Sequence, residues 1–400
     1  MEHQPAIIFG AGSVGRGFLG QLFSESGYQV VFVDVDQPLI EALDRRGSYT
    51  LRLAGVQHTQ ELAIGPVSAL NASDGERVAE AVANASIMAT AVGARALSAI
   101  ARPIAAGLAR RWQAAGSVRK SAAVNIIICE NLYDAPEVLS RHVQEALPHE
   151  LKPQVRASVG FVAAVIARMS PVPTPEQRAA DATLIVAEPY KVLPVDREAF
   201  VGTIPKIVGM YPVARFTAYV ERKLYIHNAG HCMVGYLGYR RGYQYGDQAV
   251  RDPLVDALVT QALDESSQAL AAEHGLDPVA LAENIQDLLN RFGNRALGDP
   301  ISRLARDPLR KLAANDRLVG AARLAQKHGI LPQGLSWGIA AALAYDDPAD
   351  PHAAQLQAML AGQGIDRVLQ DVCGIQPDEP LAEMVREKHR LLHSDPQWRK

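Results

Sequence analysis

Three glycines near the N-terminus have the spacing of a dinucleotide-binding loop. The GxGxxG motif directly follows an apolar run and precedes a helical pattern, in the segment Phe9-Gly10-Ala11-Gly12-Ser13-Val14-Gly15. The first glycine of such a motif permits a tight turn, the second lets the backbone approach a pyrophosphate, and the third lets the helix pack on the strand. The helix N-terminus then offers N–H groups and a positive dipole to the diphosphate. Arg16 and Gly17 extend this loop, and Arg16 can add a charge-assisted contact.

An acidic residue follows the glycines at the distance expected for a nicotinamide cofactor. Asp34 ends the second apolar run, about 20 residues past the glycines, where a carboxylate accepts hydrogen bonds from the ribose hydroxyls. A carboxylate there repels a 2′-phosphate, so the sequence predicts NAD rather than NADP. Two alternatives stay open: a glycine-rich turn that binds nothing, or one that binds S-adenosylmethionine.

A second polar group lies near the middle of the chain, in the segment Lys223-Leu-Tyr-Ile-His-Asn228-Ala-Gly-His231. On an α-helix that advances about 100° per residue, Lys223, Asn228 and His231 fall within an arc of about 140° and can all face one cleft. By spacing alone, the same three residues can equally lie on a solvent-exposed helix face and take no part in catalysis.

The elements that position these groups differ between the two halves of the chain. In the first half, apolar runs at 6–9, 29–33, 86–90, 123–129, 155–162 and 183–186 alternate with helical patterns at 15–26, 38–46, 94–114 and 135–146. This alternation predicts a Rossmann-type, doubly wound parallel sheet. Beyond about residue 205, apolar residues recur every three or four positions, as in 253–274, 278–291 and 351–373, which predicts helices. We expect a dinucleotide-binding domain at 1–204 and a mostly α-helical substrate and catalytic domain at 205–400.

Composition excludes several classes of protein. The 400 residues are 48% apolar and 21% charged with a net charge of −3, which is typical of a globular protein and disfavours nucleic acid or membrane as partners. Cys129, Cys232 and Cys373 form no CxxC pair, and no group of ligands has convincing metal spacing, so no metal site is expected. With no signal peptide or membrane span expected, the sequence predicts a cytoplasmic protein, a monomer or small homo-oligomer.

Several motifs together resemble one family. They are GAGxxGRG at the N-terminus, Thr90-Ala-Val92-Gly, Cys129-Glu-Asn131, Val220-Glu-Arg-Lys223-Leu, the Lys223-x4-Asn228-x2-His231 pattern, and Arg306-Asp-Pro-Leu-Arg310-Lys311-Leu. This set, spread over nearly the whole chain, resembles the polyol-specific long-chain dehydrogenase/reductase family, and within it the members that act on mannitol 1-phosphate.

The resemblance implies a reaction and roles for its residues. It implies metal-independent, NAD-dependent interconversion of mannitol 1-phosphate and fructose 6-phosphate, with Thr90 and Val92 beside the cofactor. Lys223 would be the general acid/base, Asn228 and Asn131 would hold the reacting oxygen, and His231 would orient the substrate. A free lysine titrates near 10.4, so activity near neutral pH requires a pKa lowered by roughly 2–3 units. Burial and the positive nicotinamide ring both lower it.

A cluster of cations suits a phosphorylated substrate. Four of them lie within nine residues: Arg303, Arg306, Arg310 and Lys311. Arginine makes bidentate contacts with phosphate and lysine acts as a point charge. The family resemblance favours Arg303 and Lys311 most. The alternative is a solvated charge cluster, because Asp299, Asp307 and Asp316 are near enough to pair with these cations.

One departure from the family bears on the substrate. Ala163 and Ala167 stand where the mannitol-phosphate members of the family carry aspartates. This difference leaves the exact substrate open, so a dehydrogenase acting on another polyol, another sugar phosphate or a hexuronate is an alternative. A non-catalytic NAD(H)-binding regulator is a further one.

Overall fold

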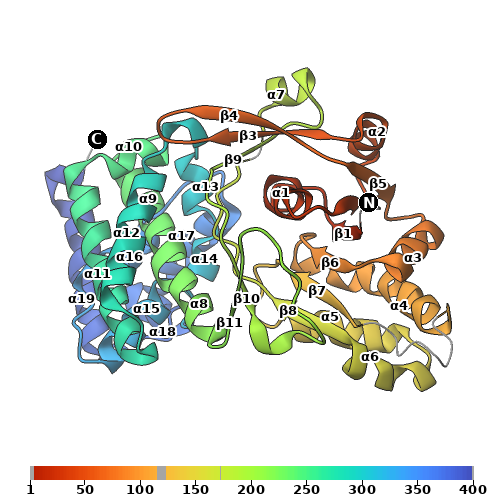
Figure 1. The fold of residues 1–400 in the computed structure, drawn as a ribbon. Coiled ribbons are helices and arrows are strands. Elements are labelled where there is room, and N and C mark those ends of the chain that lie inside the picture. Colours follow the sequence, from red (N-terminus) through yellow and green to blue (C-terminus); the bar gives the residue numbers. More distant parts are fainter. Residues whose placement is uncertain (1–3, 115–122, 172, 399–400) are drawn as a thin grey trace. The chain divides into compact units, whose positions relative to one another are not determined.

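The fold is given by a computed structural model that describes residues 4–114, 123–171 and 173–398. The chain divides into two compact units, Met1–Phe216 and Thr217–Lys400 (Figure 1). In the described residues, no helix is long and apolar enough to cross a membrane.

A six-stranded parallel sheet forms the centre of the first unit. Its strand order is β5-β2-β1-β6-β7-β8. The strands are β1 (Pro5–Phe9), β2 (Gln29–Asp34), β5 (Val67–Asn71), β6 (Ile87–Thr90), β7 (Val124–Ile128) and β8 (Val159–Ala163). β6 and β7 consist entirely of buried residues, as expected for strands covered on both faces. The predicted Rossmann-type sheet is confirmed.

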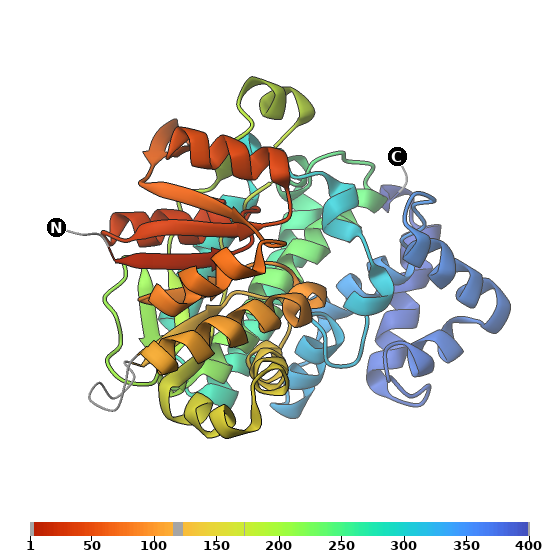
Figure 2. The same cartoon turned by 90° about the vertical axis from the view of Figure 1, so that its right-hand side faces the viewer.

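Two hydrophobic layers cover the two faces of this sheet. Alternate residues of β1 enter different layers, so that Ile7 and Phe9 face the helices on one side and Ile8 faces the other. The first side carries α3 (Gly75–Asn84), α4 (Leu97–Ala114) and α5 (Ala135–Ala146), of which α3 and α4 lie side by side in orange in Figure 2. The other side carries α1 (Gly20–Glu25) and α2 (Gln37–Arg46). Apolar side chains therefore cover both faces of the sheet, and the polar groups that can bind a ligand lie at the strand ends.

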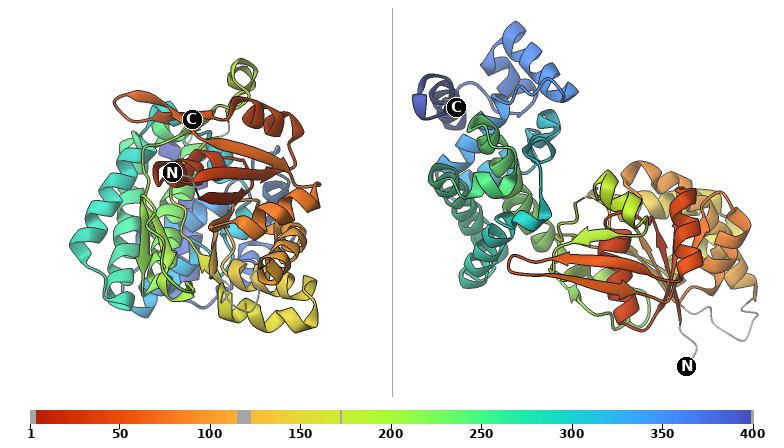
Figure 3. Two further views of the ribbon diagram at one scale, coloured as in Figure 1. Left: turned by 45° about the vertical axis from the view of Figure 1, so that its right-hand side comes forward. Right: turned by 90° about the horizontal axis from the view of Figure 1, so that it is seen from above.

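Two small sheets complete the first unit. β3 (Tyr49–Ala54) and β4 (Thr59–Ile64) form an antiparallel hairpin, seen as a long arm in Figure 3, and β9 (Ile185–Ala187) runs parallel to β3. β10 (Leu193–Asp196) pairs with β11 (Met210–Val213). The apolar run at 183–186, predicted as part of the main sheet, therefore contributes only Ile185 and Val186 to a strand, and that strand belongs to a separate sheet.

A second strand prediction was wrong in its first half. Residues 155–158 belong to α6 (Lys152–Ser158), and β8 begins only at Val159. The buried residues of α6, Val155 and Ser158, are three positions apart, which is the spacing of one helix face. The stretch of apolar residues that forms a strand therefore begins only at Val159. The unit also contains α7 (Pro175–Ala180).

The second unit is built of helices, as predicted. They are α8 (Phe216–Arg222), α9 (Ala229–Arg240), α10 (Gly246–Val250), α11 (Pro253–His274), α12 (Pro278–Phe292), α13 (Ile301–Ala305), α14 (Pro308–Lys311), α15 (Val319–Lys327), α16 (Gln333–Leu343), α17 (Pro351–Gln363), α18 (Ile365–Asp371) and α19 (Pro380–Ser394). The nearly fully buried helices α9 and α16 pack on each other and on α11, and form the centre of the unit.

Asp-Pro pairs start several of these helices. The carboxylates of Asp277 and Asp350 accept amide hydrogen bonds from the first turns of α12 and α17, as N-cap residues do. Asp307, before α14, has φ +60° and makes no such bond; its carboxylate accepts a 2.7 Å hydrogen bond from Arg310 Nε instead. The segment 351–373 is two helices rather than one, because Gly364 adopts φ +79° and ends α17.

Two short π-helices interrupt the α-helical regularity. η1 (Gly15–Leu19) precedes α1, and the Leu19 amide donates to the carbonyl of Val14, five residues back, at 3.0 Å. η5 (Lys223–Asn228) joins α8 to α9. A π-turn contains one residue more than an α-turn, and such turns are frequent at functional sites. The sequence predicts a regular helix through both segments, and that prediction was wrong.

Candidate active site

The glycine-rich loop leaves space at one of its glycines only. Gly10 has φ +96°, and a Cβ there would lie 2.3 Å from the Ala91 carbonyl oxygen. A Cβ on Gly15 would lie 1.9 Å from the Gly10 oxygen. Around Gly12, in contrast, nothing lies within 4 Å of the Cβ position. The outer glycines therefore close the turn, and Gly12 presents bare backbone to open space, as pyrophosphate binding requires.

Asp34 is in direct contact with this loop. Its Oδ2 atom accepts a 2.6 Å hydrogen bond from the Ala11 amide, and its Oδ1 atom accepts one of 2.7 Å from the Val35 amide. Oδ1 also accepts a 3.1 Å hydrogen bond from the Asp36 amide, and since a carboxylate has about four lone-pair sites, about one remains for a ribose hydroxyl. The predicted acid and glycines are therefore brought together, and the loop fits a dinucleotide.

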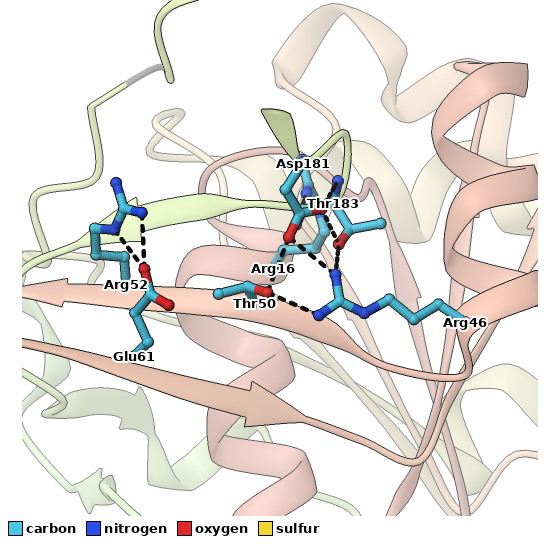
Figure 4. Close-up of polar contacts among 7 residues, drawn as sticks. All are labelled: Arg16, Arg46, Thr50, Arg52, Glu61, Asp181 and Thr183. Atoms are coloured by element: carbon cyan, nitrogen blue, oxygen red, sulfur yellow. Dashed lines mark hydrogen bonds and ion pairs between the residues drawn. The ribbon is translucent and has the colours of Figure 1, made fainter. Parts of the chain in front are cut away.

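Arg16 is built into the fold next to this loop. Its side chain is buried, with Nε donating to the Ala11 carbonyl and Nη1 to the Thr183 carbonyl, both at 2.6 Å. Burial lowers the pKa of Arg16. Figure 4 shows that Thr183 also meets Arg46, whose Nη1 donates to Thr183 Oγ1 and to Asp181, both at 2.9 Å. These contacts connect the loop to α2 and to the chain before β9, where Gly17 packs against Ser170.

Glu130, to which the sequence assigned no role, supports the turn that follows β6. The Glu130 carboxylate, just after β7, accepts hydrogen bonds from the amides of Val92 and Gly93 at 3.0 and 2.9 Å. Burial raises the pKa of Glu130. Thr90 and Phe9 lie buried at the ends of β6 and β1, beside this turn. Glu130 belongs to the Cys129-Glu-Asn131 motif and directly follows a buried strand, but neither signal predicts its contact with residues 92 and 93. Asn131 follows it in an exposed loop of the first unit.

The other three predicted catalytic residues lie in the second unit. Lys223 and Asn228 are the first and last residues of η5, and His231 lies in the first turn of α9. Hydrogen bonds in a π-helix join residues five apart, and each residue turns the chain less than in an α-helix. The π-turn thus aligns Lys223 with Asn228 more closely than an α-helix would.

His231 is held on three sides. Its ring stacks on Phe292 with centroids 4.9 Å apart and planes 7° apart, and the His227 ring meets it edge-on at 5.7 Å. Its Nε2 atom lies 3.2 Å from Asp299 Oδ2. Burial lowers the pKa of both histidines, most strongly that of His227, so both rings are neutral at pH 7.

The four predicted phosphate-binding cations have different surroundings. Arg303 forms a fork with Asp299, with Nε and Nη2 at 2.6 and 3.0 Å from the carboxylate oxygens. Arg310 is exposed and pairs with Asp307 at 2.7 Å and Asp316 at 3.7 Å. Arg306 is exposed. The carboxylates that the sequence suggested as partners are therefore used by Arg303 and Arg310.

Lys311 is the most enclosed of the four. It is buried, its Nζ donates to the Leu304 carbonyl, and it lies 5.5 Å from the centre of the Tyr236 ring. Burial lowers the pKa of Lys311 to about 8. A protonated lysine has three donors, so two remain for a ligand.

The neighbourhood of Ala163 and Ala167 contains a buried cation. Arg168 Nε donates to the Glu188 carbonyl at 2.6 Å, and Nη1 donates to Gln21 Oε1 at 2.8 Å. Burial lowers the pKa of Arg168 to about 10. Within the described residues, no group of three or more His, Cys, Asp or Glu side chains is placed to hold a metal ion.

Comparison with known proteins identifies both units. Residues 4–209 match the mannitol dehydrogenase Rossmann domain, and residues 215–392 match the mannitol dehydrogenase C-terminal domain. Mannitol-1-phosphate 5-dehydrogenase of Brevibacillus brevis is 39% identical over 97% of this chain and 98% of its own length. The Bacillus subtilis protein of that name is 37% identical over 96% of this chain and 99% of its own length.

Solved structures share the fold. The structure of Pseudomonas fluorescens mannitol 2-dehydrogenase with NAD and D-mannitol matches with a TM-score of 0.76 and 19% identity, covering 99% of this chain and 93% of that one. A D-sorbitol dehydrogenase matches with a TM-score of 0.80 and 18% identity, covering 98% and 94%. The family resemblance found in the sequence is confirmed, and the chain belongs to the mannitol dehydrogenase family.

Proposed function

We propose that this chain is an NAD-dependent polyol-phosphate dehydrogenase that interconverts mannitol 1-phosphate and fructose 6-phosphate. One observation carries the proposal. Relatives named mannitol-1-phosphate 5-dehydrogenase align with nearly the whole chain at 37–39% identity, so that both the Rossmann and the C-terminal domain have counterparts in them.

The first unit fits the NAD cofactor. The open backbone at Gly12 and the N-terminus of η1 suit the pyrophosphate, and Asp34 suits the ribose hydroxyls while repelling a 2′-phosphate. Thr90 and Val92 lie on the neighbouring strand end, which Glu130 fixes. Bound NAD supplies the hydride acceptor in oxidation and, reduced, the hydride donor. Arg16 supports the loop from behind through its two carbonyl contacts.

Proton transfer is assigned to Lys223. In oxidation its neutral amine takes the proton of the reacting hydroxyl, and in reduction its ammonium returns one to the carbonyl oxygen. The amides of Asn228 and Asn131 are neutral donors to that oxygen, and each such donor is worth about 3–4 kcal/mol of transition-state stabilisation. His231 orients the substrate through another oxygen.

The substrate phosphate is assigned to the cations after α12. Arg303 and the amine of Lys311 are the principal groups, and Arg306 and Arg310 add positive charge nearer the surface. We also propose the predicted division of labour, with residues 1–204 binding the dinucleotide and residues 205–400 holding the substrate and catalytic groups. The expected cytoplasmic location fits a phosphorylated intracellular sugar.

A related activity is the second candidate, and Ala163 and Ala167 favour it. Without the two carboxylates expected there, the enzyme can prefer another polyol, another sugar phosphate or a hexuronate.

One panel separates these candidates. NADH oxidation is measured with fructose 6-phosphate, fructose and tagaturonate, and repeated with NADPH. The leading proposal expects turnover with fructose 6-phosphate and NADH, at least tenfold above the other combinations. Preference for an unphosphorylated ketose or for tagaturonate supports the second candidate. Cofactor binding without any turnover indicates the regulator, and tighter binding of NADPH than NADH contradicts the role of Asp34.

A further inference from the structure

Asp299 joins two of the proposed substrate-binding side chains. It precedes α13 and lies between His231 on α9 and Arg303 on α13. Its Oδ2 atom is 3.2 Å from His231 Nε2 and 3.0 Å from Arg303 Nη2, and its Oδ1 atom is 2.6 Å from Arg303 Nε. One carboxylate therefore fixes an imidazole and a guanidinium on different helices.

The backbone around Asp299 is itself fixed. The Asp299 carbonyl accepts a 2.9 Å hydrogen bond from the Gly246 amide, and the Ile301 amide donates to the Gln244 carbonyl at 2.9 Å. The Asp299 side chain is only 12% exposed. Two main-chain hydrogen bonds therefore hold the segment around Asp299, in addition to the contacts of the Asp299 side chain.

Asp299 stays ionised in this position. Burial acts to raise its pKa, but the hydrogen bond with His231 and the charge of Arg303 outweigh burial, and the pKa is lowered. An ionised carboxylate can only accept hydrogen bonds. The nitrogen that faces it, His231 Nε2, must therefore carry the hydrogen.

The chemical state of His231 follows from this contact. The buried ring is neutral at pH 7, and a neutral imidazole carries one hydrogen, so Nδ1 has a free lone pair. Among the described residues, no hydrogen bond is found at His231 Nδ1 or at Arg303 Nη1. The stack on Phe292 fixes the plane of the imidazole and hence the direction of the lone pair.

We propose that Asp299 is a positioning residue that holds His231 as its Nε2–H tautomer, so that Nδ1 accepts a hydrogen bond from a substrate hydroxyl. The same carboxylate aims Arg303, leaving Nη1 as a donor to a second substrate oxygen. An acceptor beside a donor distinguishes a hydroxyl from a carboxylate or a ketone, because only a hydroxyl provides a hydrogen for Nδ1. The proposal rests on the proposed function for its substrate, while the tautomer can be measured independently.

The test compares Asp299→Asn with wild type in the full-length enzyme. The new amide is isosteric and can donate to Nε2, which would move the histidine hydrogen to Nδ1 and remove the acceptor. We expect kcat/KM for mannitol 1-phosphate to fall about 10- to 100-fold, the loss of one buried hydrogen bond, while the Kd of NADH stays within about twofold. Asp299→Glu, which keeps the acceptor, should recover part of the loss.

Nitrogen-15 NMR of histidine-labelled enzyme reads the tautomer directly, with the His231 signals assigned from a His231→Gln variant. Wild type should show a protonated-type Nε2 and an unprotonated Nδ1, and Asp299→Asn should reverse or mix them. Asp366→Asn is the matched control, because Asp366 forms an exposed ion pair with Arg386 on α19 and should change neither readout.

The outcomes are separable. An Nδ1–H tautomer in wild type, or unchanged NMR signals and activity in Asp299→Asn, overturns the inference. A wild-type enzyme with the Nε2–H tautomer but no turnover of any polyol phosphate contradicts the proposed function and leaves the positioning by Asp299 intact. If Asp299→Asn does not fold, judged by circular dichroism, Asp299→Glu and the wild-type spectrum still decide the tautomer.

Discussion

At the scale of single residues, the proposed chemistry depends on two lysines, Lys223 for proton transfer and Lys311 for phosphate binding. Lys223 is the residue on which proton transfer depends. We expect Lys223→Ala to lower kcat about 10²- to 10⁴-fold, the usual contribution of a general acid or base, with the Kd of NADH unchanged. Stopped-flow turnover and fluorescence titration measure the two effects. Lys327→Ala is the control, because Lys327 forms an exposed pair with Glu273 and should be silent. Near-normal turnover in Lys223→Ala would refute the assignment.

Lys311 should make phosphate binding depend on pH. Since burial lowers its pKa to about 8, the cation is present below pH 8 and is lost as the pH rises above it. The Ki of sulfate, a dianion that does not titrate in this range, measured as a competitor of mannitol 1-phosphate, should therefore be flat below pH 8. Above it, the Ki should rise toward about tenfold per pH unit.

The Lys311→Met variant separates this effect from titration of Lys223. In Lys311→Met the Ki should be high throughout and should not bend near pH 8, whereas kcat should keep its own pH dependence. An unchanged bend would assign the titration to another group.

The residues of the cofactor loop could be predicted from the sequence, because they lie close together in the chain. Gly10 and Gly15 are required by local backbone geometry, and Asp34 accepts a hydrogen bond from the amide of Ala11, which lies between them. Asp299 could be suggested only as a partner of the nearby Arg303. Its contact with His231 depends on how α9 packs against α13, which no local pattern encodes.

At the scale of elements, α9 and α13 pack at very close range. A Cβ added to Gly235 on α9 would lie 2.8 Å from backbone and side-chain atoms of Leu304 on α13. Because α9 carries His231 and α13 carries Arg303, separating these helices should disturb both. We expect Gly235→Ala to destabilise the protein by about 1–3 kcal/mol, through overpacking, and to raise KM for the polyol phosphate.

Gly362→Ala is the matched control for this prediction. Gly362 is exposed in the last turn of α17, and nothing lies within 4 Å of its Cβ position. An added methyl group should raise stability there by about 0.5–1 kcal/mol, since it lowers the entropy of the unfolded chain. Urea denaturation and steady-state kinetics measure both variants, and a harmless Gly235→Ala would show that α13 can move.

Helix ends were predictable where the chain marks them chemically. α11 has the predicted bounds Pro253–His274, because Asp252 caps its start and Gly275, with φ +62°, ends it. The two π-helices carry no such marks. One additional residue in a turn changes neither the composition nor the average apolar spacing, so η1 and η5 could not be predicted.

At the scale of the whole molecule, the two compact units allow separate measurements of stability. Trp112 lies in the first unit, and Trp337 and Trp398 lie in the second. If NADH binds chiefly to the first unit, a concentration of 100 times its Kd should stabilise that unit by about 2.7 kcal/mol. The fluorescence transition of Trp112 should therefore shift more than that of the other two.

The Trp112→Phe variant reports on the second unit alone and provides the comparison. A larger NADH-dependent shift in this variant than in wild type would contradict the assignment of the cofactor to the first unit. Equal shifts would show that the two units unfold together. The sequence predicts two units of different class because the pattern of apolar residues changes near residue 205. Short continuous apolar runs are typical of buried strands, and a spacing of three or four residues is typical of helices.

The π-turn at η5 has a consequence for protein engineering. The π-turn runs from Lys223 to Asn228 and contains one residue more than an α-turn. The direction of the Lys223 side chain therefore depends on the number of residues before α9 as well as on their identity. A graft of this segment between relatives must preserve that count. Shortened by one residue, it would keep every side chain needed for catalysis and point the lysine to a different side of the helix.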